Sequence, residues 1–349
     1  RRVLQDKLDA AALVAARSSS TVQSEIQALG SSALTASFTG VKIGTVKNVA
    51  FTLSVDGRTV TATAEIDVPT SVVGMFTDNT LTVAGKSEIV RQSSNLEVSL
   101  VLDMTASMAG TKIADLKVAA ADLVDLVVQD VQTPFATRVA LVPYSNSVNV
   151  GSYAAQVRGT YTSGTCTTPG CEKYKFYNQW WDDRTHTITT CATERSGTNA
   201  YTEAAPSTEF FGRHYPASGN PCPTPTIMPL SSDKAALKTA IGNLSAGGSS
   251  GGHVGIAWGW DMGSPNFSYL WPTANKPAAY KSDNLIKAVV IMTDGEYNTV
   301  HCNGVIAKDS TYGSGSDYDK INCNSPNGNA YFQSQKFCTN MKAQGVVVY

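Results

Sequence analysis

The feature that most constrains the fold of this chain is an apolar run that ends at a cluster of oxygen-bearing side chains. Residues 98–102 read Val-Ser-Leu-Val-Leu, Asp103 follows at once, and a helical pattern begins near residue 111. A buried strand of this kind delivers the Asp103 carboxylate to the loop at its C-terminal end, where open α/β sheets bind their ligands. Thr105 and Ser107 add two hydroxyls on the same loop. Three hard oxygen donors at this spacing suit a small divalent cation such as Mg²⁺.

The composition is that of a folded protein whose main partner is not a nucleic acid. A chain of 349 residues has room for two domains, or for one large domain with insertions. Hydrophobic residues make up 42% and charged residues 16%, the net charge is −1, and there is no block of Lys or Arg. This argues against nucleic acid or an anionic membrane surface as the main partner.

No apolar stretch approaches the roughly 18 residues that a membrane-spanning helix needs, and the sequence shows no signal peptide. We therefore expect a processed or excised chain, with membrane attachment only through a segment absent from it.

The first part of the chain predicts a small α+β module. Residues 1–29 carry a helical stripe of apolar side chains, and Gly30 is the predicted end of that helix. Three segments are predicted strands: 46–56, 60–68 and 81–90. Asp56-Gly57 is a hairpin turn signal between the first two strands. We expect one long N-terminal helix with antiparallel strands over residues 1–95.

From residue 96 the pattern changes to alternating strands and helices, which is typical of βαβ units around a parallel sheet. The strand candidates are 96–102, 137–143, 285–292 and 345–349. The helix candidates are 111–130, 231–244, 253–262 and 329–343. Right-handed crossovers would place the helices on both faces of the sheet. Because the last strand candidate stands at the end of the chain, we expect a domain over residues 96–349 that is incomplete at its C-terminus.

Residues 146–228 interrupt this alternation with a stretch rich in Tyr, Thr, Gly, Pro and Cys. A structureless loop of that length is unusual in a compact domain, so we expect an insertion stapled by disulfides, as in exported proteins. The disulfide candidates are Cys166, Cys171, Cys191, Cys222, Cys302, Cys323 and Cys338. The alternative is a zinc site, but no Cys-x-x-Cys or Cys/His cluster has ligand spacing. The pairing is left open, and the odd cysteine is either free or paired outside this chain.

Two more loops carry oxygen ligands between predicted elements. Residues 246–252 form a Gly-rich loop with hydroxyls at the start of a helix, and an apolar run ends at Asp294. Loops at the ends of strands in one sheet can converge on one point. The predicted ligands are Asp103, Thr105, Ser107, Ser250 and Asp294. This shell fits Mg²⁺, with Mn²⁺ or Ca²⁺ as alternatives, and leaves a position for an acidic group of a partner. The competing interpretation is that Asp103 only caps the following helix.

The three motifs Asp-x-Thr-x-Ser, Gly-Gly-Ser-Ser-Gly-Gly and Met-Thr-Asp-Gly resemble the metal-ion-dependent adhesion site (MIDAS) of von Willebrand factor A domains, over residues 96–349. The resemblance implies a Rossmann-like, mostly parallel sheet with helices on both faces. Two positions depart from the family pattern. Thr105 stands where Ser is usual, and Ser250 stands where Thr is usual, with Ser249 as the neighbouring alternative.

A narrower resemblance covers nearly the whole chain. Residues 3–15 look like the segment after the membrane helix in TadG-like, Flp/Tad pilus-associated proteins, and residues 252–262 are similar to the Trp-rich helix of those proteins. This implies a bacterial protein of the cell surface, pilus or periplasm, membrane-anchored before or instead of pilus incorporation. It also implies that residues 1–95 form a pilin-like or envelope-anchoring module, whose helix contacts pilus subunits or assembly proteins.

We expect a binding protein rather than an enzyme. The metal would bind an acidic group on a surface or protein ligand, and aromatic residues of the insertion would extend the contact. These residues are Tyr174, Tyr177, Trp180 and Trp181. The alternative is that they build a small core of the insertion itself.

The leading functional hypothesis is a minor or tip subunit that acts as an adhesin of a Tad-type pilus. The alternatives are an envelope-anchored pilus assembly component, a purely structural filament subunit, and a metal-assisted phosphoesterase. Against the last, the sequence has no Walker loop, no Gly-x-Ser-x-Gly elbow and no Cys/His nucleophile arrangement.

Overall fold

The computed structural model describes residues 2–18, 20–41, 43–69, 80–91, 94–133, 135–160, 173–177, 183–217 and 219–349, with the backbone alone for 173–177 and 183–186. The contacts divide the chain into two compact units. The first unit is Arg1–Ser94 with Asp130–Ala136, and the second is Asn95–Gln129 with Thr137–Tyr349. None of the described helices is both long enough and apolar enough to cross a membrane.

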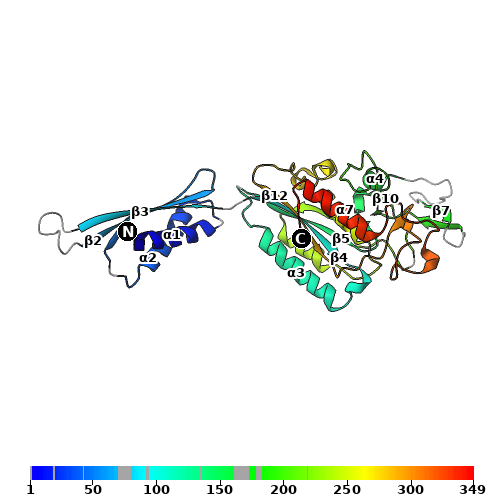
Figure 1. Cartoon of the computed structure of the whole chain (residues 1–349), viewed down its shortest axis with the longest axis horizontal. Helices are drawn as coiled ribbons and strands as arrows, with labels where there is room; N and C mark the ends of the chain where they lie inside the picture. Colours follow the sequence, from blue (N-terminus) through cyan, green and yellow to red (C-terminus); the bar gives the residue numbers. More distant parts are fainter. Residues whose placement is uncertain are drawn as a thin grey trace. The chain divides into compact units, whose positions relative to one another are not determined.

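The first unit packs two helices against a three-stranded antiparallel sheet (Figure 1). Its elements are α1 (Arg2–Arg17), α2 (Gln23–Ser37), β1 (Thr45–Leu53), β2 (Thr59–Pro69) and β3 (Thr80–Val90). The strand order is β1-β2-β3. Helix α1 packs against β2 and β3, and α2 packs against β1. Apolar side chains of both helices and of the strands form one buried core, which includes Leu8, Leu34 and Phe51.

The prediction of one long helix over residues 1–29 is wrong, because the chain breaks between α1 and α2. The Ser18 hydroxyl accepts a hydrogen bond from the Ser20 amide at 3.1 Å, and the Ser20 hydroxyl accepts one from the Val22 amide at 3.0 Å. Such local bonds from serine side chains compete with the helical backbone pattern. Gly30 does not end a helix either. It lies inside α2, where a Cβ atom would stand 2.3 Å from the Phe51 ring.

We predict that Gly30→Ala destabilises the first unit. Helix propensity alone favours alanine by about 1 kcal/mol, but overpacking against the buried Phe51 costs roughly 1–3 kcal/mol. The measurement is urea unfolding followed by circular dichroism. All 5 tryptophans lie in the second half of the chain, so tryptophan fluorescence reports the second unit separately.

The matched control for this substitution is Gly242→Ala. Gly242 is the last residue of α5, and a Cβ atom there meets nothing within 4 Å. This variant should leave the unfolding of the first unit unchanged and make the second unit no less stable, because helix propensity favours alanine and nothing opposes its Cβ atom. A Gly30→Ala protein more stable than the unaltered one would contradict the packing argument.

The second unit is built on an eight-stranded mixed sheet with the order β10-β9-β6-β5-β4-β12-β15, in which β11 also pairs with β5. Its strands are β4 (Asn95–Asp103), β5 (Thr137–Tyr144), β6 (Val148–Asn149), β9 (Cys191–Thr193), β10 (Gly212–Arg213), β11 (Met228–Ser231), β12 (Leu285–Met292) and β15 (Val347–Val348). The strands β5, β4, β12 and β15 run parallel, and β6, β9, β10 and β11 pair antiparallel. The sheet is therefore mixed rather than mostly parallel.

Helices cover both faces of this sheet, and Figure 1 shows α3 and α7 on opposite sides of the strands. The helices are α3 (Thr111–Val127), α4 (Ala154–Arg158), α5 (Lys234–Gly242), α6 (Gly252–Gly263) and α7 (Ala330–Ala343). Short 3₁₀ helices are η2 (Ala106–Met108), η3 (Gly151–Tyr153), η4 (Pro265–Phe267), η5 (Thr273–Asn275) and η6 (Asp317–Asp319). Two small antiparallel pairs complete the unit: β7 (Lys173–Tyr177) with β8 (Asp183–Thr187), and β13 (His301–Cys302) with β14 (Val305–Ile306).

The central strand β4 supplies side chains to both cores, because successive residues of a strand point to opposite faces. Leu100 and Leu102 belong to the core beneath α3 and α5, whereas Val101 belongs to the core beneath α6 and α7. Helix α6 lies very close to the strands, since a Cβ atom at Gly255 would stand 2.5 Å from the Tyr144 ring. Trp258 of this helix is fully buried in the same core.

The segment 146–228, expected as an insertion, contributes directly to the sheet. Its strands β6, β9 and β10 extend the sheet beyond β5, and β11 returns to pair with β5. Residues 144–150 are buried throughout. Backbone pairing, together with the disulfide between Cys191 and Cys222, therefore holds the described part of this segment to the domain.

Candidate metal centre

The parallel strands place a topological switch point at the C-terminal end of β4. The chain passes from β4 through α3 to β5 on one side, and β12 later pairs with β4 on the other side. Ligands of open α/β sheets bind beyond the carboxyl ends of the strands, where the strand order reverses in this way. Asp103 is the last residue of β4, and Thr293 and Asp294 directly follow β12. The topology therefore brings both predicted carboxylates to this switch point.

The Asp103 carboxylate is fully buried and fixed by three hydrogen bonds. Its Oδ1 accepts from the amide of Thr105 at 2.9 Å. Its Oδ2 accepts from the hydroxyl of Tyr144 at 2.8 Å and from that of Thr293 at 2.7 Å. Burial, and after it the charge of Asp103, raises the pKa of Tyr144 well above its ordinary value. The phenol therefore keeps its proton and stays a donor to the carboxylate.

The other predicted ligands of the first and third loops lie together beside Asp103. The hydroxyl oxygens of Thr105 and Ser107 are 3.0 Å apart, and Ser107 forms a hydrogen bond with the Asp294 side chain. Lys112, in the first turn of α3, donates to Oδ2 of Asp294 at 2.9 Å. Burial acts to raise the pKa of Asp294, but the bonds from Lys112 and Ser107 outweigh it and lower the pKa. Asp294 is therefore ionised at neutral pH.

The Gly-rich second loop lies against the first loop. The amide of Ala106 donates to the carbonyl of Gly248 at 2.9 Å, and the amide of Gly247 donates to the carbonyl of Met104 at 2.8 Å. These two bonds place Ser250 two residues beyond the contact with the first loop.

The two serines of this loop differ in what holds their hydroxyls. The hydroxyl of Ser249 accepts a hydrogen bond from that of Thr299 at 2.6 Å, and Thr299 is not one of the predicted metal ligands. Among the described residues, no hydrogen bond is made by the Ser250 hydroxyl, although its backbone is fixed by Asn298 and Thr299. Ser250 is therefore the serine whose hydroxyl is available as a metal ligand.

The donor set fits a hard divalent cation. Its members are two carboxylates and three hydroxyls, all oxygen, which is the chemistry that Mg²⁺ prefers. Within the described part of the chain, the Oδ1 atom of Asp294 is buried and has no hydrogen-bond partner. A buried carboxylate oxygen without a partner requires an explanation such as a bound ion or water. A cation held by Asp103, Thr105, Ser107, Ser250 and Asp294 would supply that partner.

Sequence reasoning identified the carboxylates but missed the residues that position them. The strand candidate at 137–143 ends one residue before Tyr144, and Thr293 enters the sequence argument only as part of the motif around Asp294. Both stand one position from the end of an apolar run. This is the signal that could have marked them as neighbours of Asp103.

The predicted disulfides and aromatic ligands have mixed outcomes. Disulfides join Cys191 to Cys222 and Cys302 to Cys323, so these four cysteines are paired as expected, and Cys338 is free. Four candidates lie outside the described residues: Cys166, Cys171, Trp180 and Trp181. Tyr174 and Tyr177 lie on β7, for which the backbone alone is described.

No family model matches this chain, and no curated protein matches it. Among solved structures, the pilus adhesin SpaC from Lactobacillus rhamnosus GG, in its open conformation, is similar over 87% of this chain and 27% of its own, with 12% identity and a TM-score of 0.32. A von Willebrand factor type A protein from Catenulispora acidiphila is similar over 72% of this chain and 41% of its own, with 15% identity and a TM-score of 0.22. This chain thus spans less than half the length of both structures. These TM-scores are too low for the likeness to support an argument about fold or function.

We predict that Lys112→Met strengthens Mg²⁺ binding about threefold or more, because the Lys112 ammonium competes with the metal for Asp294 and repels it. Isothermal titration calorimetry with MgCl₂ at low ionic strength measures the change, which salt should reduce by screening. Lys117→Met is the matched control. It removes the same charge from α3 at a residue without an ion pair in the described part of the chain. Equal or weaker binding by Lys112→Met would show that Lys112 does not compete.

Proposed function

We propose that this chain is a metal-dependent adhesion protein that binds a partner through a Mg²⁺ ion in a MIDAS-type site. The observation that carries the proposal is the convergence of oxygen donors at the C-terminal end of β4, together with the buried, unpartnered Oδ1 of Asp294. When bound, the metal would offer a coordination position to a carboxylate of the partner. The chain's own residues hold the site rigid, since Asp103 is oriented by Tyr144 and Thr293.

The titratable groups around the site support binding rather than catalysis. Tyr144 donates to Asp103 and has a raised pKa, so it is a poor general base at neutral pH. Lys112 is paired with Asp294, which raises its pKa and keeps it protonated. Neither group is thus arranged to accept a proton from a substrate.

The proposal places the protein on a bacterial Tad-type pilus, as a tip or minor subunit at the cell surface. The support is the similarity of residues 3–15 and 252–262 to TadG-like proteins. Helix α1 covers the sheet of the first unit with Leu4 and Leu8 and leaves apolar side chains exposed on its outer face. These are Val3, Leu13 and Val14, each 44–49% exposed. Such a face could contact pilus subunits or assembly proteins.

We predict that Asp103→Ala and Asp294→Ala each weaken Mg²⁺ binding at least about 100-fold. The fold should survive at lower stability, because the two residues stand at the ends of β4 and β12 and belong to neither apolar core. Calorimetry measures metal binding, and circular dichroism checks the fold. Attachment is measured with carboxylate-coated beads, in Mg²⁺ and in chelator. Asp122→Ala, which removes an exposed carboxylate from α3, is the control.

The same experiment separates the alternatives. Bead attachment that persists equally in chelator would contradict the metal-bridging mechanism. Incubation with Mg²⁺ and p-nitrophenyl phosphate tests for phosphoesterase activity. Turnover that disappears in Asp103→Ala would contradict a function limited to binding.

We further predict that the protein is recovered with pili sheared from native cells, at low abundance relative to the major pilin. Quantitative mass spectrometry of the sheared and envelope fractions provides the measurement. Retention in the envelope fraction alone would instead support an anchored assembly component.

A further inference from the structure

A second polar cluster lies buried in the same unit and contains none of the oxygen ligands described above. Glu194 directly follows β9, His253 lies in the first turn of α6, and His301 begins β13. Each residue offers one ligand atom, and these atoms all lie within 4.8 Å of one another. The side chains of His253, His301 and Glu194 are 0%, 2% and 5% exposed. Three distant segments thus deliver a carboxylate and two imidazoles to one buried point.

The distances within this cluster suit a small metal ion. The Nε2 atom of His253 lies 2.8 Å from Oε1 of Glu194, and the Nδ1 atom of His301 lies 3.3 Å from the same oxygen. Zinc bonds of about 2.0–2.2 Å in a tetrahedral shell put neighbouring ligand atoms about 3.3 Å apart. The two distances from Oε1 to the ring nitrogens therefore lie within about half an ångström of those of such a shell, and the two ring nitrogens lie within 4.8 Å of each other.

The Glu194 carboxylate is surrounded by more hydrogen-bond donors than it has lone-pair sites to accept them. Besides the two imidazoles, Oε1 accepts from the amide of His301 at 2.7 Å. Its Oε2 is approached by Gln333 at 3.0 Å, Asn327 at 3.3 Å and Ser325 at 3.5 Å. Six donors exceed the roughly four lone-pair sites of a carboxylate. One cation shared by Oε1 and the two ring nitrogens would replace two of these donors with a single contact and reduce the excess.

The surrounding bonds are those of a supported metal ligand. Gln333 and Asn327 donate to the other carboxylate oxygen, Oε2, and so fix the orientation of Glu194, as outer residues do around metal-binding carboxylates.

A cavity of about 330 Å³ lies beside the cluster and is lined by Glu194 and His301. Its wall also contains Arg158, Arg195 and Arg213. An ion held by one carboxylate and two neutral imidazoles keeps a net positive charge and an open position. The cavity gives access to that position, and its arginines favour an anionic fourth ligand.

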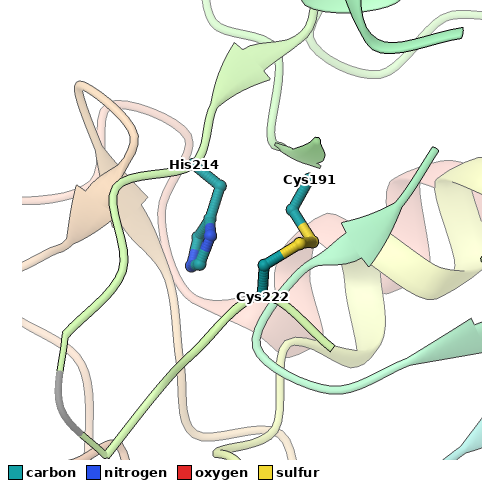
Figure 2. A group of neighbouring side chains, drawn as sticks. All are labelled: Cys191, His214 and Cys222. Carbon is teal, nitrogen blue, oxygen red and sulfur yellow. A yellow bond between two sulfur atoms is a disulfide. The ribbon is translucent and has the colours of Figure 1, made fainter. Parts of the chain in front are cut away.

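A neighbouring group of donors does not compete for the metal. Figure 2 shows His214 beside Cys191 and Cys222, whose sulfur atoms are joined in a disulfide. Sulfur atoms in a disulfide are not the thiolates that bind metals. The ring of His214 contacts that of His301 edge to face, with centroids 6.5 Å apart, and its Nδ1 lies 3.2 Å from the Thr189 hydroxyl. His214 is thus a buried histidine next to the cluster but outside it.

We propose that Glu194, His253 and His301 bind a zinc-class divalent ion with an open fourth position facing the cavity. Nitrogen and carboxylate donors favour Zn²⁺ over Mg²⁺, so this site and the oxygen-lined site take different metals. The site would join the β9 segment, α6 and β13 through one ion. It does not depend on the proposed adhesion function.

The test uses the full chain with its disulfides intact. The protein is stripped with a chelator, returned to excess MgCl₂, and titrated with ZnCl₂, and the retained zinc is counted after gel filtration. We expect one zinc per chain. Glu194→Gln and His301→Gln should bind zinc at least about 100-fold more weakly, whereas His214→Gln, the matched control, and Asp103→Ala should retain it.

A measurement on the unaltered protein keeps the test decisive if the variants fail to fold. The chain has 4 histidines, and nitrogen NMR of their rings reports which of them zinc contacts. Zinc should produce the chemical-shift change of a metal-bound ring nitrogen at His253 and His301. It should produce no such change at His186 and His214. Absence of stoichiometric zinc, retention of zinc in both cluster variants, or shifts confined to the other two histidines would overturn the proposal.

Discussion

The buried carboxylate of Asp103 is the interaction on which the rest of the second unit depends. A carboxylate at the end of a central strand is costly to bury unless its oxygens are hydrogen-bonded. Its partners come from both flanking strands, because the register sets Asp103 opposite Tyr144 and places Thr293 just beyond the pair of Leu102 with Met292. A shift of one residue in either pairing would turn these side chains to the other face. The register of the strands, the packing of the cores and the position of the oxygen ligands are thus fixed together.

The two ends of β4 show why one buried carboxylate is structural and the other is available for a ligand. At the N-terminal end, Glu97 pairs with both Lys287 and Arg138 and also accepts from the amide of Ala278. Its charge is neutralised within the protein. At the C-terminal end, Lys112 pairs with Asp294, and within the described part of the chain Asp103 has no ion pair. The excess negative charge at that end is what a divalent ion would balance.

The features that the sequence predicted well are those with local signals. The apolar runs before Asp103 and Asp294 marked β4 and β12 almost to the residue, because burial on both faces requires continuous apolar side chains. The break between α1 and α2 escaped prediction, since the apolar stripe continues across it, whereas among the described residues the Ser18 and Ser20 hydroxyls accept local backbone hydrogen bonds there. The contribution of β6, β9 and β10 to the sheet also escaped prediction, because strands of two or three residues have no periodicity to detect.

The histidine cluster could not be predicted for a different reason. Neither His253 nor His301 has a neighbour at metal-ligand spacing in the sequence. Glu194 is separated from His301 by 107 positions, so only the folded sheet brings them together. No local pattern encodes such a contact.

The two polar centres share the segments that build them. Ser250 and His253 are three residues apart, where the second loop enters α6, and Asp294 and His301 stand at the two ends of one short connection. Between the latter pair, the amides of Asn298 and Thr299 both donate to the carbonyl of Ser250. Because these backbone bonds tie the two segments to each other, the position of Ser250 at the oxygen site depends on the same loop that carries His301 to Glu194. The cluster around Glu194 therefore helps to hold the second loop in place. The rigidity of the oxygen site thus depends partly on residues that do not contact its ligands.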